Sequence, residues 1–140
     1  MKTKRTRHAV YDITYHLVGC PKYRRKVLTG PVGKRLEELI RDKVDELDGE
    51  VVALEIQPDH VHLFAGFLPT LAVRQIMHCI KGATSYTLRR EFPFLKSRLP
   101  SLWTRSYYVG TAGNVSAETA IVPAAQRSGI QRYIEAQKGH

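Results

Sequence analysis

Two segments of the chain alternate between apolar and polar residues, which is the pattern of a β-strand with one buried face. They span residues 11–18 and 60–67. Side chains two apart along a strand lie on the same face, so His60, His62 and Phe64 share one face of the second segment. The opposite face of that segment is apolar throughout, and we expect it to point into the core.

Other segments repeat their apolar residues at intervals of three and four, as an amphipathic helix does, or are rich in strand-forming residues. The pattern predicts helices at residues 31–47, 71–91 and 130–138, and further strands at residues 51–56 and 106–112. Gly49 and Pro93 follow the first two helices and are natural helix ends.

The predicted order is strand, helix, strand, strand, helix, strand, helix. Its first six elements follow the ferredoxin-like β-α-β-β-α-β plan. This α+β fold has a four-stranded antiparallel sheet with two helices on one face, and we expect it to form a single domain over residues 1–140. The other face of the sheet is then open to a ligand, such as a single strand of nucleic acid.

The composition fits one compact domain that does not enter a membrane. The chain has 140 residues, of which 43% are hydrophobic, enough for a single core. No apolar run reaches the roughly 18 residues of a membrane-spanning helix. The basic segment at residues 1–8 is not followed by the apolar stretch of a signal peptide. We therefore expect a cytoplasmic protein.

The net charge of +9, from 22 basic and 13 acidic residues, favours a polyanionic partner. Nucleic acid is preferred to an anionic membrane, because no basic amphipathic helix with a strong apolar face stands out. Each basic residue alone is also explained by ordinary surface charge. The candidates for DNA contacts are Lys22, Arg24, Arg25, Lys26, Arg74 and Lys81. Tyr23 and Trp103 are either stacking platforms for unpaired bases or core aromatics.

A histidine pair on a strand is the main candidate for metal chemistry. The imidazoles of His60 and His62 project from one face about 7 Å apart along the strand. They can bind one divalent ion if a third ligand comes from elsewhere. Asp59 is a candidate partner for one imidazole. Two surface histidines on a half-exposed strand are the alternative, which is the commoner one for this spacing alone.

A second candidate lies on the last predicted helix. Tyr133 and Gln137 are four residues apart and therefore on one helical face. A phenol and an amide presented together suit a nucleophile and a metal ligand. Ile130 and Ile134 form the neighbouring apolar stripe that would seat the helix. Taken alone, Tyr133 is more often a packing residue on such a helix.

These segments resemble the single-tyrosine transposases of small bacterial and archaeal insertion sequences, which belong to the HUH superfamily. Residues 57–63, Gln-Pro-Asp-His-Val-His-Leu, resemble the HUH motif (His, hydrophobe, His). Residues 133–137, Tyr-Ile-Glu-Ala-Gln, resemble the helix that carries the nucleophile. Further similarities lie at residues 15–18, 21–24, 81–85, 103 and 107–109, so the resemblance spans nearly the whole chain in the family's order.

The resemblance implies a role for each matching residue. His60 and His62 would bind Mg²⁺ or Mn²⁺, with Gln137 as the third protein ligand. Tyr133 would attack the scissile phosphodiester and leave a 5′-phosphotyrosine and a free 3′-hydroxyl. The implied partners are single-stranded DNA with hairpins at the element ends and a second copy of the chain, forming a homodimer whose active site is shared between subunits. No nucleotide cofactor is implied.

The chemistry of the residues is compatible with these roles. Imidazole and oxygen ligands without a thiolate suit Mg²⁺ or Mn²⁺ with a DNA phosphate as co-ligand, although Zn²⁺ would bind the histidines too. A phenol has a pKa of about 10 and is mostly protonated at neutral pH. Phenolate is also a fair leaving group, so the covalent step can run backwards.

Residues 120–129 depart from the family pattern, which runs without interruption into the tyrosine helix. Here ten residues intervene. Pro123 and Gly129 are poor in a helix interior, so we expect a break before the Tyr133 helix, with Ser128 as a new helix cap. Ten extended residues add up to about 33–36 Å of reach, which predicts a longer and looser tether for the nucleophile.

Three functions remain open from the sequence. The first is a divalent-metal-dependent DNA transposase, including a related branch that acts on dispersed repeats. The second is a catalytically impaired, hairpin-DNA-binding protein of the same fold, supported by the insertion. The third is a zinc-dependent hydrolase of a small substrate, which lacks a general-base carboxylate beside the histidines apart from Asp59 and leaves the basic excess unexplained.

Overall fold

The computed structural model describes residues 14–112 and 124–137. Its elements are β1 (Thr14–Gly19), the short helix η1 (Lys22–Arg24), α1 (Gly30–Glu46), β2 (Glu50–Gln57), β3 (His60–Gly66), α2 (Val73–Glu91), α3 (Pro93–Arg98), β4 (Tyr108–Ala112) and α4 (Ala124–Ala136). The predicted order of strands and long helices is confirmed. Residues 11–13 of the first predicted strand and residue 138 of the last predicted helix lie outside the described ranges.

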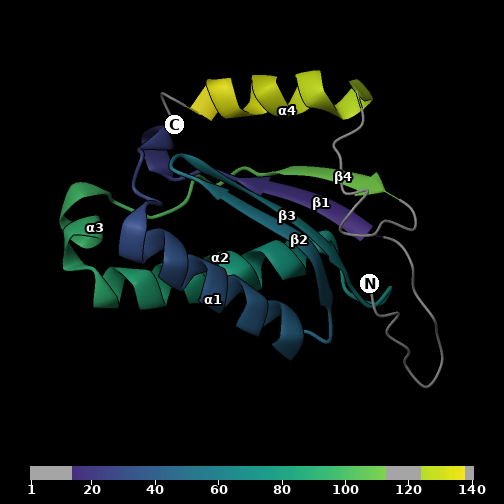
Figure 1. Cartoon of the computed structure of the whole chain (residues 1–140), viewed down its shortest axis with the longest axis horizontal. Helices are drawn as coiled ribbons and strands as arrows, with labels where there is room; N and C mark the ends of the chain where they lie inside the picture. The colour runs from purple at the N-terminus through teal and green to yellow at the C-terminus, as the bar shows by residue number, and fades with distance from the viewer. Residues whose placement is uncertain (1–13, 113–123, 138–140) are drawn as a thin grey trace.

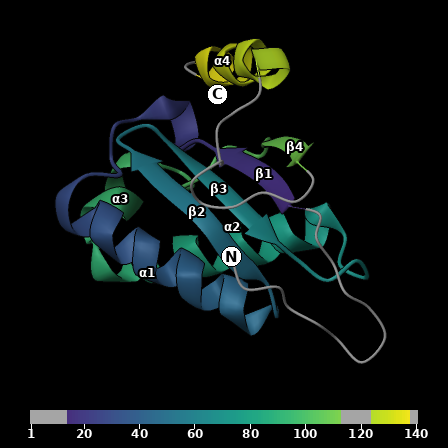
Figure 2. The ribbon, with the colours of Figure 1, turned by 45° about the vertical axis from the view of Figure 1, so that its right-hand side comes forward.

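The four strands form one antiparallel sheet in the order β2-β3-β1-β4. Figure 1 shows α1 and α2 against one face of this sheet, as the ferredoxin-like plan predicts. The prediction of an open opposite face was wrong, because α4 lies over that face in the views of both Figure 1 and Figure 2. The C-terminal helix is therefore a third layer, placed where a ligand was expected.

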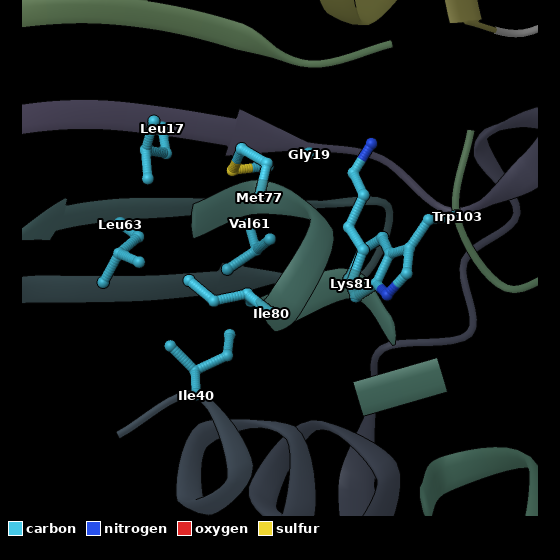
Figure 3. Close-up of a pocket in the computed structure, with 9 residues that line it drawn as sticks. All are labelled: Leu17, Gly19, Ile40, Val61, Leu63, Met77, Ile80, Lys81 and Trp103. Carbon is cyan, nitrogen blue, oxygen red and sulfur yellow. The ribbon is translucent and has the colours of Figure 1, made fainter. Parts of the chain in front are cut away.

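Apolar side chains from the two long helices and the inner face of the sheet form the core. The buried residues of α1 recur at intervals of four, as the periodicity predicts, and are Val32, Leu36, Ile40 and Val44. A cavity of about 30 Å³ remains between α2 and the sheet (Figure 3). In the described ranges, no helix is both long enough and apolar enough to span a bilayer.

The hairpin between β2 and β3 positions the histidines. Gln57 pairs with His60 across the ladder, so Pro58 and Asp59 form the turn. The backbone N–H of Leu28 donates to the carbonyl of Pro58 at 3.0 Å and holds this turn to the chain before α1. His60 is consequently the first residue of β3, and its side chain lies on the face opposite the core, as predicted.

Helix α4 begins earlier than predicted. It runs without interruption from residue 124, so the expected break before Ile130 and the role of Ser128 as a cap were wrong. The segment Ala124-Ala125-Gln126-Arg127 consists of strong helix formers, whose propensity outweighs the cost of Gly129. Residues 124–129 of the ten-residue insertion thus belong to the helix that carries Tyr133.

Two other boundaries differ from the prediction. Pro93 ends α2 but also begins the short helix α3, because proline suits a first helical position. The fourth strand begins at Tyr108 and not at Ser106. The carbonyl oxygen of Ser106 instead accepts hydrogen bonds from the side chains of Lys81 and Tyr133, which takes this residue out of the ladder.

Candidate active site

The two predicted metal ligands project side by side from β3. The ring centroids of His60 and His62 are 4.9 Å apart. His60 donates from Nδ1 to Asp59 Oδ1 at 2.7 Å, since a carboxylate can only accept. This bond fixes the ring and leaves Nε2 of His60 for a ligand. The predicted pairing of Asp59 with an imidazole is confirmed.

His62 is oriented by a second histidine from the neighbouring strand. Its Nδ1 lies 3.1 Å from Nε2 of His16, and the His16 ring is buried and stacked on Phe64, with centroids 4.1 Å apart. Burial lowers the pKa of His62, and the nearby His60 lowers it further. The neutral imidazole, which is the form that binds metals, is thereby favoured.

The pair of imidazoles fits a divalent ion, although the described residues do not form a complete metal site by themselves. No cluster of three or more His, Cys, Asp and Glu side chains in the described ranges is placed to hold a metal. The Nε2 atoms of His60 and His62 are the nitrogen atoms available to coordinate a metal, because Nδ1 of each ring is engaged by Asp59 or His16. Such an arrangement requires oxygen ligands from Gln137, from DNA or from water to complete the coordination.

Tyr133 lies in a seat built by residues 104–106, in the segment that precedes β4. Its hydroxyl donates to the carbonyl oxygen of Ser106 at 2.9 Å. The hydroxyls of Ser106 and Thr104 lie 3.3 Å and 3.5 Å from the phenol oxygen. Burial raises the pKa of Tyr133, against an opposing effect of these hydrogen bonds. The phenol is therefore protonated in this position.

Gln137 shares the same seat. Its amide oxygen accepts a hydrogen bond from Ser106 Oγ at 3.0 Å, and its amide nitrogen donates to the carbonyl of Tyr133 at 2.9 Å. The side chain is buried, with 6% of its surface exposed. The predicted pairing of Tyr133 with Gln137 on one helical face is confirmed, whereas the amide oxygen is bonded to Ser106 and its role as a metal ligand stays a prediction.

Arg24 links the histidines to the tyrosine helix. Its Nε lies 3.2 Å from Asp59 Oδ2, the carboxylate whose other oxygen accepts from His60. Its Nη1 donates to the carbonyl of Ile134 in α4 at 3.4 Å. Tyr23 and Arg24 both have positive φ, 59° and 50°, a costly conformation that marks functional sites in many proteins.

The other predicted DNA contacts fall into two groups. Arg25, Lys26 and Arg74 are exposed and accessible to a polyanion. Lys22 belongs to the same group, and its Nζ lies 5.4 Å from the ring centroid of Tyr23. Lys81 is different, because its ammonium donates to the carbonyls of Thr104 and Ser106 at 2.8 Å and 2.7 Å. As DNA contacts, all of these residues stay predictions.

Two residues of the site, Ser106 and His16, were not found by sequence reasoning as functional, and a third, Arg24, was predicted with a different role. Ser106 has no local signal, because a serine before a strand is commonplace. His16 was placed on the correct face of its strand, but its partner depends on the register between β1 and β3, in which Val18 lies opposite His62. Arg24 was predicted as a DNA contact, and its link to Asp59 depends on the packing of η1 against the turn between β2 and β3, which is far away along the chain.

The comparisons with known proteins agree with this site. The family model for IS200-like transposases matches residues 9–137. The ISDra2 transposase TnpA of Deinococcus radiodurans is 37% identical over 98% of this chain and 92% of its own length. The IS200 transposase of Salmonella typhimurium is 29% identical over 93% of this chain and 80% of its own length.

Solved structures give the same result. A crystal structure from Deinococcus radiodurans, described as that of a transposase, superposes with a TM-score of 0.81 at 35% identity, covering 98% of this chain and 99% of that one. A REP-associated tyrosine transposase bound to a REP hairpin has a TM-score of 0.55 at 13% identity, covering 96% of this chain and 69% of that one, and it shares the fold.

The fold and the histidine motif identify the class of protein, a single-tyrosine transposase of the HUH superfamily. More particularly, the chain belongs to the IS200-like transposase family.

Proposed function

We propose that this transposase cuts and rejoins single-stranded DNA at the ends of its element through a 5′-phosphotyrosine on Tyr133. The observation that supports this most directly is that one side chain, Arg24, contacts both the turn that carries the histidines and the helix that carries Tyr133. Arg24 joins the two groups, through Asp59 on one side and Ile134 on the other. Phosphodiester cleavage requires a nucleophile and a cation that neutralises a phosphate oxygen, which Tyr133 and a metal ion held by His60 and His62 would supply.

In the forward step, the phenol oxygen of Tyr133 forms a bond to phosphorus and the bond from phosphorus to O3′ breaks. The phenol proton passes to water, and O3′ takes up a proton from water. The products are a 3′-hydroxyl and a 5′-phosphotyrosine. Rejoining is the reverse step with the 3′-hydroxyl of a new strand, so the energy of the phosphodiester is retained and no nucleotide cofactor is required.

The chain's own residues hold the reacting groups in place. His60 and His62, with Gln137, would bind Mg²⁺ or Mn²⁺, and the bound ion would neutralise a non-bridging oxygen of the phosphate. Asp59 and His16 keep the imidazoles oriented through Nδ1.

The DNA partner we propose is a single strand with hairpins at the element ends. The relative of similar fold that is bound to a REP hairpin supports this kind of partner, as does the net charge of +9. The exposed residues Arg25, Lys26 and Arg74 are proposed phosphate contacts. Binding through phosphates weakens as salt concentration rises, with a slope set by the number of contacts.

We further propose that the protein acts as a homodimer with a shared active site. In the single chain, α4 lies over its own β4, so a shared site requires α4 to leave its seat and dock on the partner. Mixing a Tyr133→Phe variant with a His60→Ala variant tests this. Activity restored in the mixture indicates a shared site, whereas no activity indicates that each subunit uses its own tyrosine.

The test of the proposed function is covalent capture of DNA. Overlapping single-stranded oligonucleotides that tile the genomic DNA on both sides of the gene are incubated with the protein, with Mn²⁺, Mg²⁺ or a chelator. We expect a denaturant-resistant adduct that requires the metal and is absent from Tyr133→Phe. Hairpin binding without an adduct in the unmodified protein would support the alternative function, a catalytically impaired hairpin-DNA-binding protein.

A further inference from the structure

Lys81 connects the helix layer to the seat of the nucleophile. Its side chain leaves α2, runs beside Trp103 along the wall of the core cavity and extends toward the level of Gly19 at the end of β1 (Figure 3). Its ammonium then donates to the carbonyl oxygens of Thr104 and Ser106 at 2.8 Å and 2.7 Å. Lys81 therefore begins on α2, and its ammonium contacts the loop that holds Tyr133.

The carbonyl oxygen of Ser106 accepts hydrogen bonds from Lys81, from Tyr133 and, at 3.2 Å, from the hydroxyl of Thr104. The phenol donates to it at 2.9 Å, slightly longer than the 2.7 Å bond from the ammonium. A carbonyl oxygen has two lone pairs, and the ammonium and the phenol make the two shortest of its three hydrogen bonds. This carbonyl fits a phenol, which donates a hydrogen bond, and disfavours a phenolate, which can only accept; the hydroxyls of Ser106 and Thr104 are the groups of the seat that can donate to the phenol oxygen.

Attack on phosphorus changes the phenol into an acceptor. Its bond to the Ser106 carbonyl is then lost, and a nearby cation becomes the favourable partner for the developing charge. An ammonium has three N–H donors, and Lys81 uses two of them within the described part of the chain. Burial lowers the pKa of Lys81 to about 8, so the charged form still predominates at neutral pH.

We propose that Lys81 is a positioning residue for Tyr133: through the Ser106 carbonyl it sets the resting place of the phenol, and its ammonium offsets the charge of the phenolate during cleavage and rejoining. This inference rests on the proposed function and extends it to a residue outside the histidine and tyrosine motifs. Because rejoining expels the same phenolate, Lys81 acts on both directions of the reaction.

The proposal differs measurably from the role in DNA contact that the sequence predicts for this lysine. A phosphate contact contributes to DNA affinity and to its salt dependence. A residue that acts on the nucleophile contributes to the maximum rate at saturating DNA. The two roles therefore separate in a single-turnover experiment in which DNA concentration and salt are both varied.

The experiment compares Lys81→Met, Lys81→Arg and, as a matched control, Lys96→Met, an exposed lysine on α3. Adduct formation with the tiling oligonucleotide is followed in Mn²⁺. For Lys81→Met we expect a maximum rate about 10- to 100-fold lower, with unchanged half-saturating DNA and an unchanged salt slope. Lys81→Arg keeps the cation and recovers most of the rate, and Lys96→Met behaves like the unmodified protein.

Two results would overturn the inference. One is weaker DNA binding with a shallower salt slope at an unchanged maximum rate, which identifies a phosphate contact. The other is an equal loss in Lys81→Met and Lys81→Arg, which shows that the charge is unimportant. Hydrogen exchange of the strand amides in each variant verifies that the sheet is intact. Failure of the unmodified protein to form any adduct is a separate outcome and rejects the proposed function itself.

Discussion

The histidine half and the tyrosine half of this site are held in different ways. His60 and His62 lie on β3, which is paired along its length with both β2 and β1. Tyr133 lies on α4 and Gln137 directly follows it, and this segment is held by hydrogen bonds to Ser106 and Arg24. The position of the histidines is thus fixed by strand pairing, whereas the position of Tyr133 depends on hydrogen bonds of individual side chains, which can break.

This difference suits a reaction that must move a DNA strand. In the proposed reaction, the metal-binding half stays in place, whereas the helix that carries Tyr133 can leave its seat after cleavage and is seated again for rejoining. Helix α4 is attached by few bonds, of the kind that open locally at a lower free energy than a paired sheet. The seat at Ser106 is then a resting position and not a permanent one.

The largest effects are expected from removing the histidines. His60→Ala or His62→Ala each deletes one of the two imidazoles, and we expect adduct formation to fall by at least about 100-fold while hairpin binding is retained. The control is His78→Ala, an exposed histidine on α2. Calorimetry with Mn²⁺ measures the metal binding directly. Normal Mn²⁺ affinity in both histidine variants would place the metal elsewhere and contradict the account of this half.

A smaller effect is expected from the link between the halves. Arg24→Met removes the ion pair with Asp59 and the bond to α4 and leaves neighbouring basic residues in place. We expect the maximum rate to fall about 10-fold, since partners that orient metal ligands typically contribute about 10–100-fold. Hydrogen exchange in α4 should become faster in the same variant.

The matched comparison is Arg25→Met, which removes an exposed cation one residue away. This change should raise the half-saturating DNA concentration and reduce the salt slope, with little effect on the maximum rate. If Arg24→Met and Arg25→Met behave alike, Arg24 is simply another phosphate contact and the proposed coupling between the halves is absent.

The sequence predicted the histidine half better than the tyrosine half, for a physical reason. The face of His60 and His62 follows from a period of two along one strand, which is a local property. The seat of Tyr133 depends on residues 104–106 and on Lys81, which are far away along the chain and meet only after the sheet has formed. Nothing in the local pattern around Ser106 indicates such a contact.

The start of α4 illustrates a different failure. The prediction of a break rests on Pro123 and Gly129, with Ser128 as a cap, and leaves out the helix-forming residues 124–127 that precede Ser128. The prediction that the second face of the sheet is open was wrong for a related reason. The ferredoxin-like plan covers only the first six elements, so it does not specify where a seventh element packs.

The most direct test of the central claim is to determine which side of a cleaved strand is joined to Tyr133. Oligonucleotides labelled at either the 5′ or the 3′ end are cleaved in Mn²⁺, and the adduct is digested and identified by mass spectrometry. The account predicts that the 3′-labelled fragment is attached through its 5′ phosphate to the peptide containing Tyr133, and that the 5′-labelled fragment is released with a free 3′-hydroxyl. Attachment through a 3′ phosphate, attachment to another residue, or cleavage that persists in Tyr133→Phe would contradict it.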